Sequence, residues 1–161
     1  VILWISNFVA GLGGCPMQKL NIVCVGKLKE KFFADAVAEY CKRLTRFAAV
    51  HICELPERRT LAEEAEHILR EVRGVCFVLA VEGKKLSSEQ LAALVRAQCD
   101  AGREMTFVIG SSCGLDDSVK KRADMLLSFS DMTFPHQLMR VILCEQLYRA
   151  FMINSGSTYH K

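Results

Sequence analysis

The first pattern that could do chemistry is a short loop bounded by glycines, Gly110-Ser111-Ser112-Cys113-Gly114. It follows the apolar run Met105–Ile109, which predicts a buried strand, and precedes a predicted short helix over residues 116–122. Glycine at such a turn lets a ligand approach the backbone closely. Neither the lysine of a phosphate-binding P-loop nor the G-x-G-x-x-G spacing of a dinucleotide site is present. The loop therefore predicts either a different ligand turn or an ordinary strand-to-helix turn.

The second candidate is the segment Phe129-Ser130-Asp131-Met132-Thr133-Phe134-Pro135-His136. Two aromatic rings, a threonine and a proline crowd a loop before a long predicted helix, which makes the segment a candidate ligand wall. Pro135 suits the start of that helix, and His136 would lie in its first turn, where the helix dipole lowers the pKa of the imidazole. A histidine at a helix start is also often a structural hydrogen bonder. His136 is therefore a candidate for either role.

Three charged residues stand on the long helix predicted over residues 136–154, which otherwise has an apolar stripe: Arg140, Glu145 and Arg149. Glu145 and Arg149 have i, i+4 spacing and could simply pair with each other. Both a structural pair and a ligand contact are consistent with this pattern.

The C-terminal run places Tyr159 beside His160 and Lys161. An aromatic ring next to two potential cations suits an RNA base and its phosphate, although such tails usually fray. The chain as a whole carries a net charge of +3. A charge of this size does not by itself establish an RNA partner.

The elements that must position these residues alternate between strands and helices. Short β-branched or apolar runs predict strands, and runs with apolar residues three or four apart predict helices. This alternation predicts a parallel α/β sheet with helices on both faces and ligand-binding loops at the carboxyl ends of its strands, after Val81, Ile109 and Phe129. The expected strands are 19–25, 49–55, 75–81, 105–109 and 125–129, and the expected helices are 30–44, 61–72, 87–99, 116–122 and 136–154.

Length and composition predict a single domain. The 161 residues are 51% apolar and 24% charged, as in globular proteins. The eight cysteines include no C-x-x-C pair, so we expect reduced thiols and no metal site. Residues 1–16 are apolar and glycine-rich but lack the basic start of a secretory signal and the length of a membrane span. We expect a natural start at Met17, residues 1–16 outside the fold, one domain over 17–161 and a cytoplasmic protein.

From Met17 to Lys161 the chain resembles the RlmH-type pseudouridine methyltransferases of the SPOUT class. The resemblance rests on KLNIVCVGKLKEKFF with AEYCKRL, on GKKLSSEQLA and VIGSSCGL, on LSFSDMTFPHQLMRVILCEQLYRAF and on the final YHK. It implies a trefoil knot in the C-terminal half, S-adenosylmethionine bound in that knot, and a homodimer in which the partner chain completes each site.

The resemblance also implies a reaction and its residues. The reaction is methylation of N3 of a pseudouridine in the helix 69 stem-loop of 23S rRNA, on the assembled 70S ribosome and without a membrane or metal. The implied cofactor residues are Leu79, Gly110, Phe129, Ser130, Asp131, Met132, Thr133 and Phe134. The implied residues around the target base are His136, Arg140, Arg149, Tyr159 and His160.

Two departures from the family pattern define the alternatives. Ser111 stands where the family usually has a second glycine, and Ala80 stands where relatives are often acidic, with Glu82 as a substitute. One alternative is therefore a non-catalytic rRNA-binding module of the same fold. A cysteine-dependent redox protein is a second alternative, but no thiol is paired with another or placed beside a base.

Overall fold

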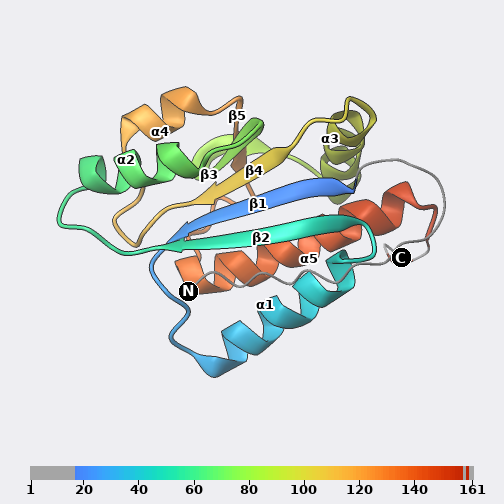
Figure 1. Ribbon diagram of the computed structural model, residues 1–161, viewed down its shortest axis with the longest axis horizontal. Coiled ribbons are helices and arrows are strands. Elements are labelled where there is room, and N and C mark those ends of the chain that lie inside the picture. The colour runs from blue at the N-terminus through green and yellow to red at the C-terminus, as the bar shows by residue number, and fades with distance from the viewer. Residues whose placement is uncertain (1–16, 158, 160–161) are drawn as a thin grey trace.

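The computed structural model describes residues 17–157 and residue 159. The extension predicted over residues 1–16 and the tail residues His160 and Lys161 lie outside the described residues. Strands and helices alternate along the described chain (Figure 1). In order they are β1 (Gln18–Val25), α1 (Lys31–Leu44), β2 (Ala48–Leu55), α2 (Leu61–Glu71), β3 (Val75–Lys85), α3 (Ser88–Asp100), β4 (Met105–Ile109), α4 (Asp117–Arg122), β5 (Met125–Ser128) and α5 (His136–Asn154).

The strands form one parallel sheet in the order β2-β1-β4-β3-β5. Val23 in β1 pairs with Cys53 of β2 on one side and with Val108 of β4 on the other. The predicted parallel α/β sheet is confirmed. Because every strand runs the same way, all carboxyl ends lie at one edge.

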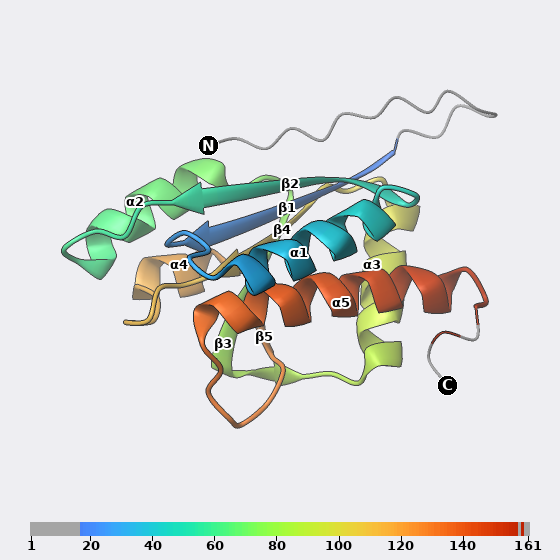
Figure 2. The same ribbon diagram turned by 90° about the horizontal axis from the view of Figure 1, so that it is seen from below.

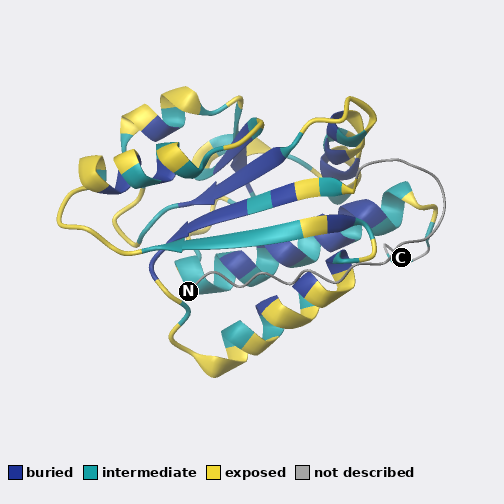
Figure 3. Ribbon diagram, viewed as in Figure 1, coloured by how far each residue is buried: buried dark blue, intermediate teal, exposed yellow. Residues whose placement is uncertain are grey.

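Helices cover both faces of the sheet, as predicted. Ile22 and Cys24 of β1 belong to a core that includes side chains of α1, α3 and α5, whereas Val23 and Val25 face a smaller core with α2 and α4. This alternation explains why β1 is apolar from Ile22 to Val25, since both of its faces are buried there. Helices α1 and α5 lie side by side (Figures 1 and 2), and the central strands are the most buried part of the sheet (Figure 3).

Strand β3 is longer than predicted, because it continues past Val81 to Lys85. Its pairing with β5 shifts register between Leu79 and Lys84, which marks a bulge. Gly83 permits the close approach there, because a Cβ at this position would lie 2.6 Å from the carbonyl carbon of Leu127. The predicted loop after Val81 is therefore a bulged strand. Its polar and glycine residues do not resemble a buried strand, which is why the apolar pattern ended early.

Ser87 and Gln90 form a capping box at the start of α3. The Ser87 hydroxyl accepts from the Gln90 amide at 3.2 Å, and the Gln90 side chain accepts from the Ser87 amide at 2.9 Å. Among the described residues, no helix has the length and apolar character needed to cross a membrane. The trefoil knot stays a prediction.

Candidate active site at the carboxyl ends of β3, β4 and β5

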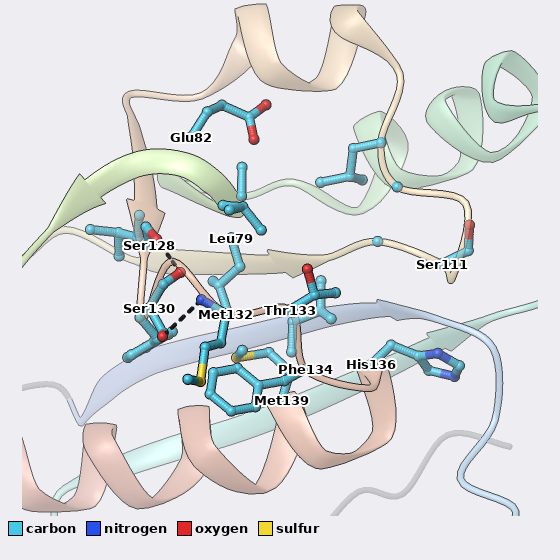
Figure 4. A pocket seen from close by; sticks show the side chains of 18 of the residues that line it. Leu79, Glu82, Ser111, Ser128, Ser130, Met132, Thr133, Phe134, His136 and Met139 are labelled. Carbon is cyan, nitrogen blue, oxygen red and sulfur yellow. Dashed lines mark hydrogen bonds between the residues drawn. The ribbon is translucent and has the colours of Figure 1, made fainter.

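A cavity of about 230 Å³ opens at the edge of the sheet where β3, β4 and β5 end (Figure 4). The first turn of α5 closes its remaining side through His136 and Met139. The wall is largely apolar, with a few polar groups between. Its lining residues are Leu79, Ala80, Val81, Glu82, Ile109, Gly110, Ser111, Gly114, Leu115, Lys120, Leu127, Ser128, Phe129, Ser130, Met132, Thr133, Phe134, His136 and Met139.

The loop after β4 is tight, and its first glycine is required by space. A Cβ on Gly110 would lie 2.5 Å from the carbonyl oxygen of Gly114 and 2.6 Å from Cγ of Leu115. The loop closes through the Gly114 amide, which donates to the Ser111 carbonyl at 3.0 Å. The Ser111 hydroxyl is buried and has no hydrogen-bond partner among the described residues. A bare backbone next to an unpartnered hydroxyl is suited to a ligand.

The loop after β5 is held by its own serines (Figure 4). The Ser128 hydroxyl donates to the Ser130 carbonyl at 3.0 Å, and the Met132 amide donates to the Ser130 hydroxyl at 3.0 Å. These bonds fold the loop over the cavity, where Phe134 joins the wall. The Met132 side chain remains 73% exposed, which leaves an apolar group at the surface beside the cavity.

The cavity wall carries one opposite-charge pair, Glu82 of β3 and Lys120 of α4. The Lys120 ammonium donates to the Glu82 carboxylate at 2.6 Å. This hydrogen bond lowers the pKa of Glu82, so the carboxylate is ionised at neutral pH. Ala80, which also lines the cavity, brings no polar group. Glu82 is therefore the acidic side chain in the described cavity wall.

Comparison with known proteins decides the family. The family model described as a predicted SPOUT methyltransferase matches residues 18–160. The chain belongs to the SPOUT methyltransferase family. It is 49% identical over 159 residues to the ribosomal RNA large subunit methyltransferase H of Lactobacillus acidophilus, an alignment covering 89% of this chain and 100% of that protein. The protein of the same name from Bifidobacterium adolescentis is 50% identical over 162 residues, with the same coverage.

Two solved structures support the fold independently. A probable methyltransferase from Bordetella pertussis superposes with a TM-score of 0.53 at 12% identity, over 83% of this chain and 94% of that chain. A putative methylase family protein from Neisseria gonorrhoeae gives a TM-score of 0.52 at 10% identity, over 85% and 86% of the two chains. At such low identities the likeness concerns the fold alone.

The structure brings nearly all of the predicted cofactor residues of this methyltransferase to one cavity. Those that line it are Leu79, Gly110, Phe129, Ser130, Met132, Thr133 and Phe134. Asp131 is exposed and pairs instead with the ammonium of Lys85, so the described structure gives it no place in the wall. Whether these residues hold a cofactor stays a prediction.

Arg140 is not placed to contact a substrate. Its side chain is 1% exposed and donates to the Glu54 carboxylate at 2.7 Å. It also donates to the carbonyl oxygens of Val25 at 3.1 Å and Gly26 at 2.6 Å, while its Nε has no partner among the described residues. The Glu54 carboxylate accepts in addition from the Leu28 amide at 3.1 Å. Arg140 therefore ties the ends of β1 and β2 to the first turns of α5, in disagreement with the predicted base contact.

His136 lines the cavity (Figure 4). Its Nε2 lies 3.5 Å from the position that a Cβ on Gly26 would take, so the imidazole also borders the end of β1. Burial lowers the pKa of His136, and the nearby positive charge of Arg140 lowers it further, while Glu57 opposes both. The predicted direction is confirmed. The largest cause is burial rather than the helix dipole, so the physical reason differs from the one expected.

Arg149 and Tyr159 meet each other at the opposite end of α5. The Arg149 guanidinium lies 5.0 Å from the centre of the Tyr159 ring and pairs with Glu145 at 2.5 Å, as the i, i+4 spacing predicted. His136 and Arg149 are thirteen residues apart on α5, which corresponds to about 20 Å along its axis. Within one chain, these residues and the cavity are therefore separate. His160 lies outside the described residues.

The described cysteines are free thiols. Burial raises the pKa of Cys24 to about 12 and that of Cys76 to about 11, which makes both poor nucleophiles. Within the described ranges, no group of three or more His, Cys, Asp or Glu side chains could hold a metal ion.

Sequence reasoning missed two of the residues that shape this site. Lys120 was read only as part of a short helix, although a helix directly after a ligand loop is a signal that its residues can reach the ligand. Glu54 was assigned only to a strand, although a carboxylate near the end of a largely apolar strand requires a partner where it is partly buried. From that requirement, an ion pair of Glu54 with a buried cation such as Arg140 could have been predicted.

Proposed function

We propose that the chain uses S-adenosylmethionine to methylate N3 of a pseudouridine in helix 69 of 23S rRNA, on the assembled 70S ribosome in the cytoplasm. Full-length relatives named ribosomal RNA large subunit methyltransferase H, at 49% and 50% identity, support an rRNA substrate. The sequence motifs shared with RlmH-type enzymes support the nucleotide and the position.

The residues of the cavity fit this cofactor. Gly110 leaves its backbone bare where a side chain would clash, and the buried Ser111 hydroxyl offers an unused hydrogen-bonding group. Ser111 therefore need not prevent binding, although relatives usually have glycine there. The Glu82 carboxylate provides an acceptor for hydroxyl groups in place of Ala80. When bound, S-adenosylmethionine supplies a methyl group already activated by the adjacent sulfonium.

The protein's own contribution is mainly positioning. Loops fixed by Gly110 and Ser130 set the orientation of the donor, and the apolar wall with Phe134 excludes water. The ring nitrogen must lose its proton, which His136, His160 or water could accept. The lowered pKa keeps His136 neutral at pH 7 and therefore able to accept a proton.

We further propose a homodimer in which the partner supplies the far end of α5. Arg149 would stabilise the developing charge on the uracil oxygen, with Tyr159 beside the base. The separation of about 20 Å along α5 supports this proposal, because one base cannot contact both ends of the same helix.

The dimer proposal is tested by mixing two inactive variants, Gly110→Ala and Arg149→Ala. If sites are shared between chains, mixed dimers contain one intact site, and random exchange restores about a quarter of the wild-type turnover. No recovery, with subunit exchange verified by mass spectrometry, would contradict shared sites.

The main support for the proposed function is that the loops after β4 and β5 and His136 line one cavity. The test is methylation of purified ribosomes with labelled S-adenosylmethionine, followed by mapping of the modified nucleotide. Gly110→Ala should lose the label, whereas Cys113→Ser, in the same loop but outside the wall, should keep it. Titration calorimetry of the wild type that gave no heat with the cofactor would support the non-catalytic rRNA-binding alternative.

A further inference from the structure

Five exposed cations follow the carboxyl ends of β1 and β2, and we call this set of residues the basic rim. It consists of Lys27, Lys29 and Lys31 after β1 and of Arg58 and Arg59 after β2. The two segments adjoin because the strands are paired neighbours and because the Gly26 amide donates to the Leu55 carbonyl at 2.8 Å. The parallel sheet therefore brings the starts of these two segments, about thirty residues apart in the chain, to the same edge.

The basic rim borders the methyltransferase cavity. The Lys29 amide donates to the side chain of Gln137 at 2.8 Å, and Gln137 is the neighbour of His136 in the first turn of α5. His136 itself lines the cavity and borders Gly26. A substrate lying on the rim would therefore reach the cavity over His136. Figure 1 shows the chain after β1 passing beside the start of α5.

The cations of the rim are available for a partner. Lys31 pairs with Asp35, and both side chains are exposed, so this pair is weak. The other rim cations have no ion pair with the described residues. Two nearby carboxylates are already engaged: Glu64 accepts from the Arg58 amide at 3.1 Å and Glu63 from the Arg59 amide at 3.3 Å. Glu30 and Glu57 lie in the same two segments and offset part of the positive charge.

An exposed aromatic ring stands within the same surface. Phe32 follows Lys31 in the first turn of α1, and 62% of it is exposed, although phenylalanine is normally buried. Its ring lies 4.3 Å from that of Phe33. Cations that neutralise phosphates and an aromatic ring on which a base can stack are the two components of a surface for single-stranded nucleic acid.

We propose that the basic rim and Phe32 form the docking surface for the substrate RNA, holding its phosphate backbone while the target base enters the cavity. This inference rests on the proposed rRNA substrate. It assigns RNA binding to the ends of β1 and β2. These belong to the same chain as the cavity that receives the target base, and not to the partner chain.

The test compares two double variants that each remove two positive charges. Lys27→Gln/Lys29→Gln alters the rim, and Lys19→Gln/Arg103→Gln alters exposed residues at the opposite edge of the sheet, at the start of β1 and before β4. Binding to purified ribosomes is measured by sedimentation between 50 and 200 mM salt, without any turnover. Affinity for S-adenosylmethionine is measured separately by calorimetry.

The rim variant should bind ribosomes more weakly, and its logarithmic salt slope should be smaller by about 2, because two phosphate contacts are lost. Across this salt range, its affinity should then change about tenfold less than that of the control variant. In turnover assays KM for ribosomes rises while kcat and cofactor affinity stay unchanged. Phe32→Ala should weaken ribosome binding between about fivefold and about 150-fold, the range for loss of one stacked base.

Equal salt slopes for the rim and control variants would overturn the proposal. It would also be overturned if the rim variant bound an isolated helix 69 stem-loop as well as the wild type but bound ribosomes poorly, since the partner would then be a ribosomal protein. A change of oligomeric state in Phe32→Ala, seen by light scattering, would instead assign this face to a second copy. Failure of the proposed methylation is distinguishable, because binding is measured without catalysis.

Discussion

Replacing Arg140 with methionine should destabilise the protein strongly although the side chain touches no substrate. Methionine fills a similar volume but leaves Glu54 charged with no cation, and it removes the donors that Val25 and Gly26 use. Breaking a buried ion pair from one side costs about 3–5 kcal/mol. Because 25% of the Glu54 side chain remains exposed, water solvates part of its charge. We therefore expect a loss of about 3 kcal/mol, at the lower end of that range.

The assay is urea unfolding followed by circular dichroism, with Arg140→Met compared with Arg140→Met/Glu54→Gln. Glutamine removes the uncompensated charge but keeps an acceptor for the Leu28 amide, which now donates to Glu54 at 3.1 Å. The double variant should therefore be more stable than Arg140→Met alone by about 1–3 kcal/mol. This recovery is specific to a charge pair and would not follow from a general packing defect.

The outcome that refutes this reasoning is easily stated. If Arg140→Met lost less than about 1 kcal/mol of stability, the typical effect of an ordinary substitution, and yet abolished turnover, Arg140 would act on the substrate. Cofactor affinity gives an independent check. Loosening of the first turn of α5, which carries His136 and Met139 in the cavity wall, should weaken cofactor binding as well as lower stability.

Three further predictions concern the cavity and its surroundings. Gly110→Ala should lower stability by about 1–3 kcal/mol and weaken S-adenosylmethionine binding, measured by calorimetry, because its Cβ has no room. Iodoacetamide added to the folded protein at pH 8 should label the exposed Cys113 and spare the buried Cys24, whose pKa is about 12. Peptide mapping identifies the labelled cysteines. By NMR titration, His136 should ionise below its usual pKa, and removal of the Arg140 charge should raise that value. Labelling of native Cys24, or an unchanged His136 pKa in Arg140→Met, would contradict these accounts.

The sequence allowed the position of the site to be predicted because parallel topology leaves little freedom. Apolar runs such as Met105–Ile109 are too short for helices and alternate with helical segments, so their carboxyl ends must share an edge. The loops beginning at Gly110 and Phe129 therefore had to meet, and the structure places both in one cavity wall. The long helix α5 was equally predictable, since no glycine or proline interrupts its apolar stripe.

The bulged part of β3 could not be predicted in the same way. Its residues Glu82 to Lys85 are polar, and only the approach of β5 at Gly83 makes them strand-like. Hydrophobic periodicity predicts which residues of a segment are buried. This segment is a strand because it pairs with β5, and the sequence pattern does not contain that pairing.

Arg140 shows what a linear pattern cannot contain. On the helix it looks like Arg149, a cation in an apolar sequence, and both suggested a ligand. The difference lies in partners: Arg149 finds Glu145 one turn earlier on the same helix, whereas Arg140 finds Glu54, which is 86 residues away. The local pair could be expected from spacing, but the distant one depends on β2 and α5 meeting beneath the loop after β1. The same contact explains why His136, one turn before Arg140, borders both the cavity and the end of β1, so that one buried guanidinium holds the place where the proposed cofactor and RNA sites would adjoin.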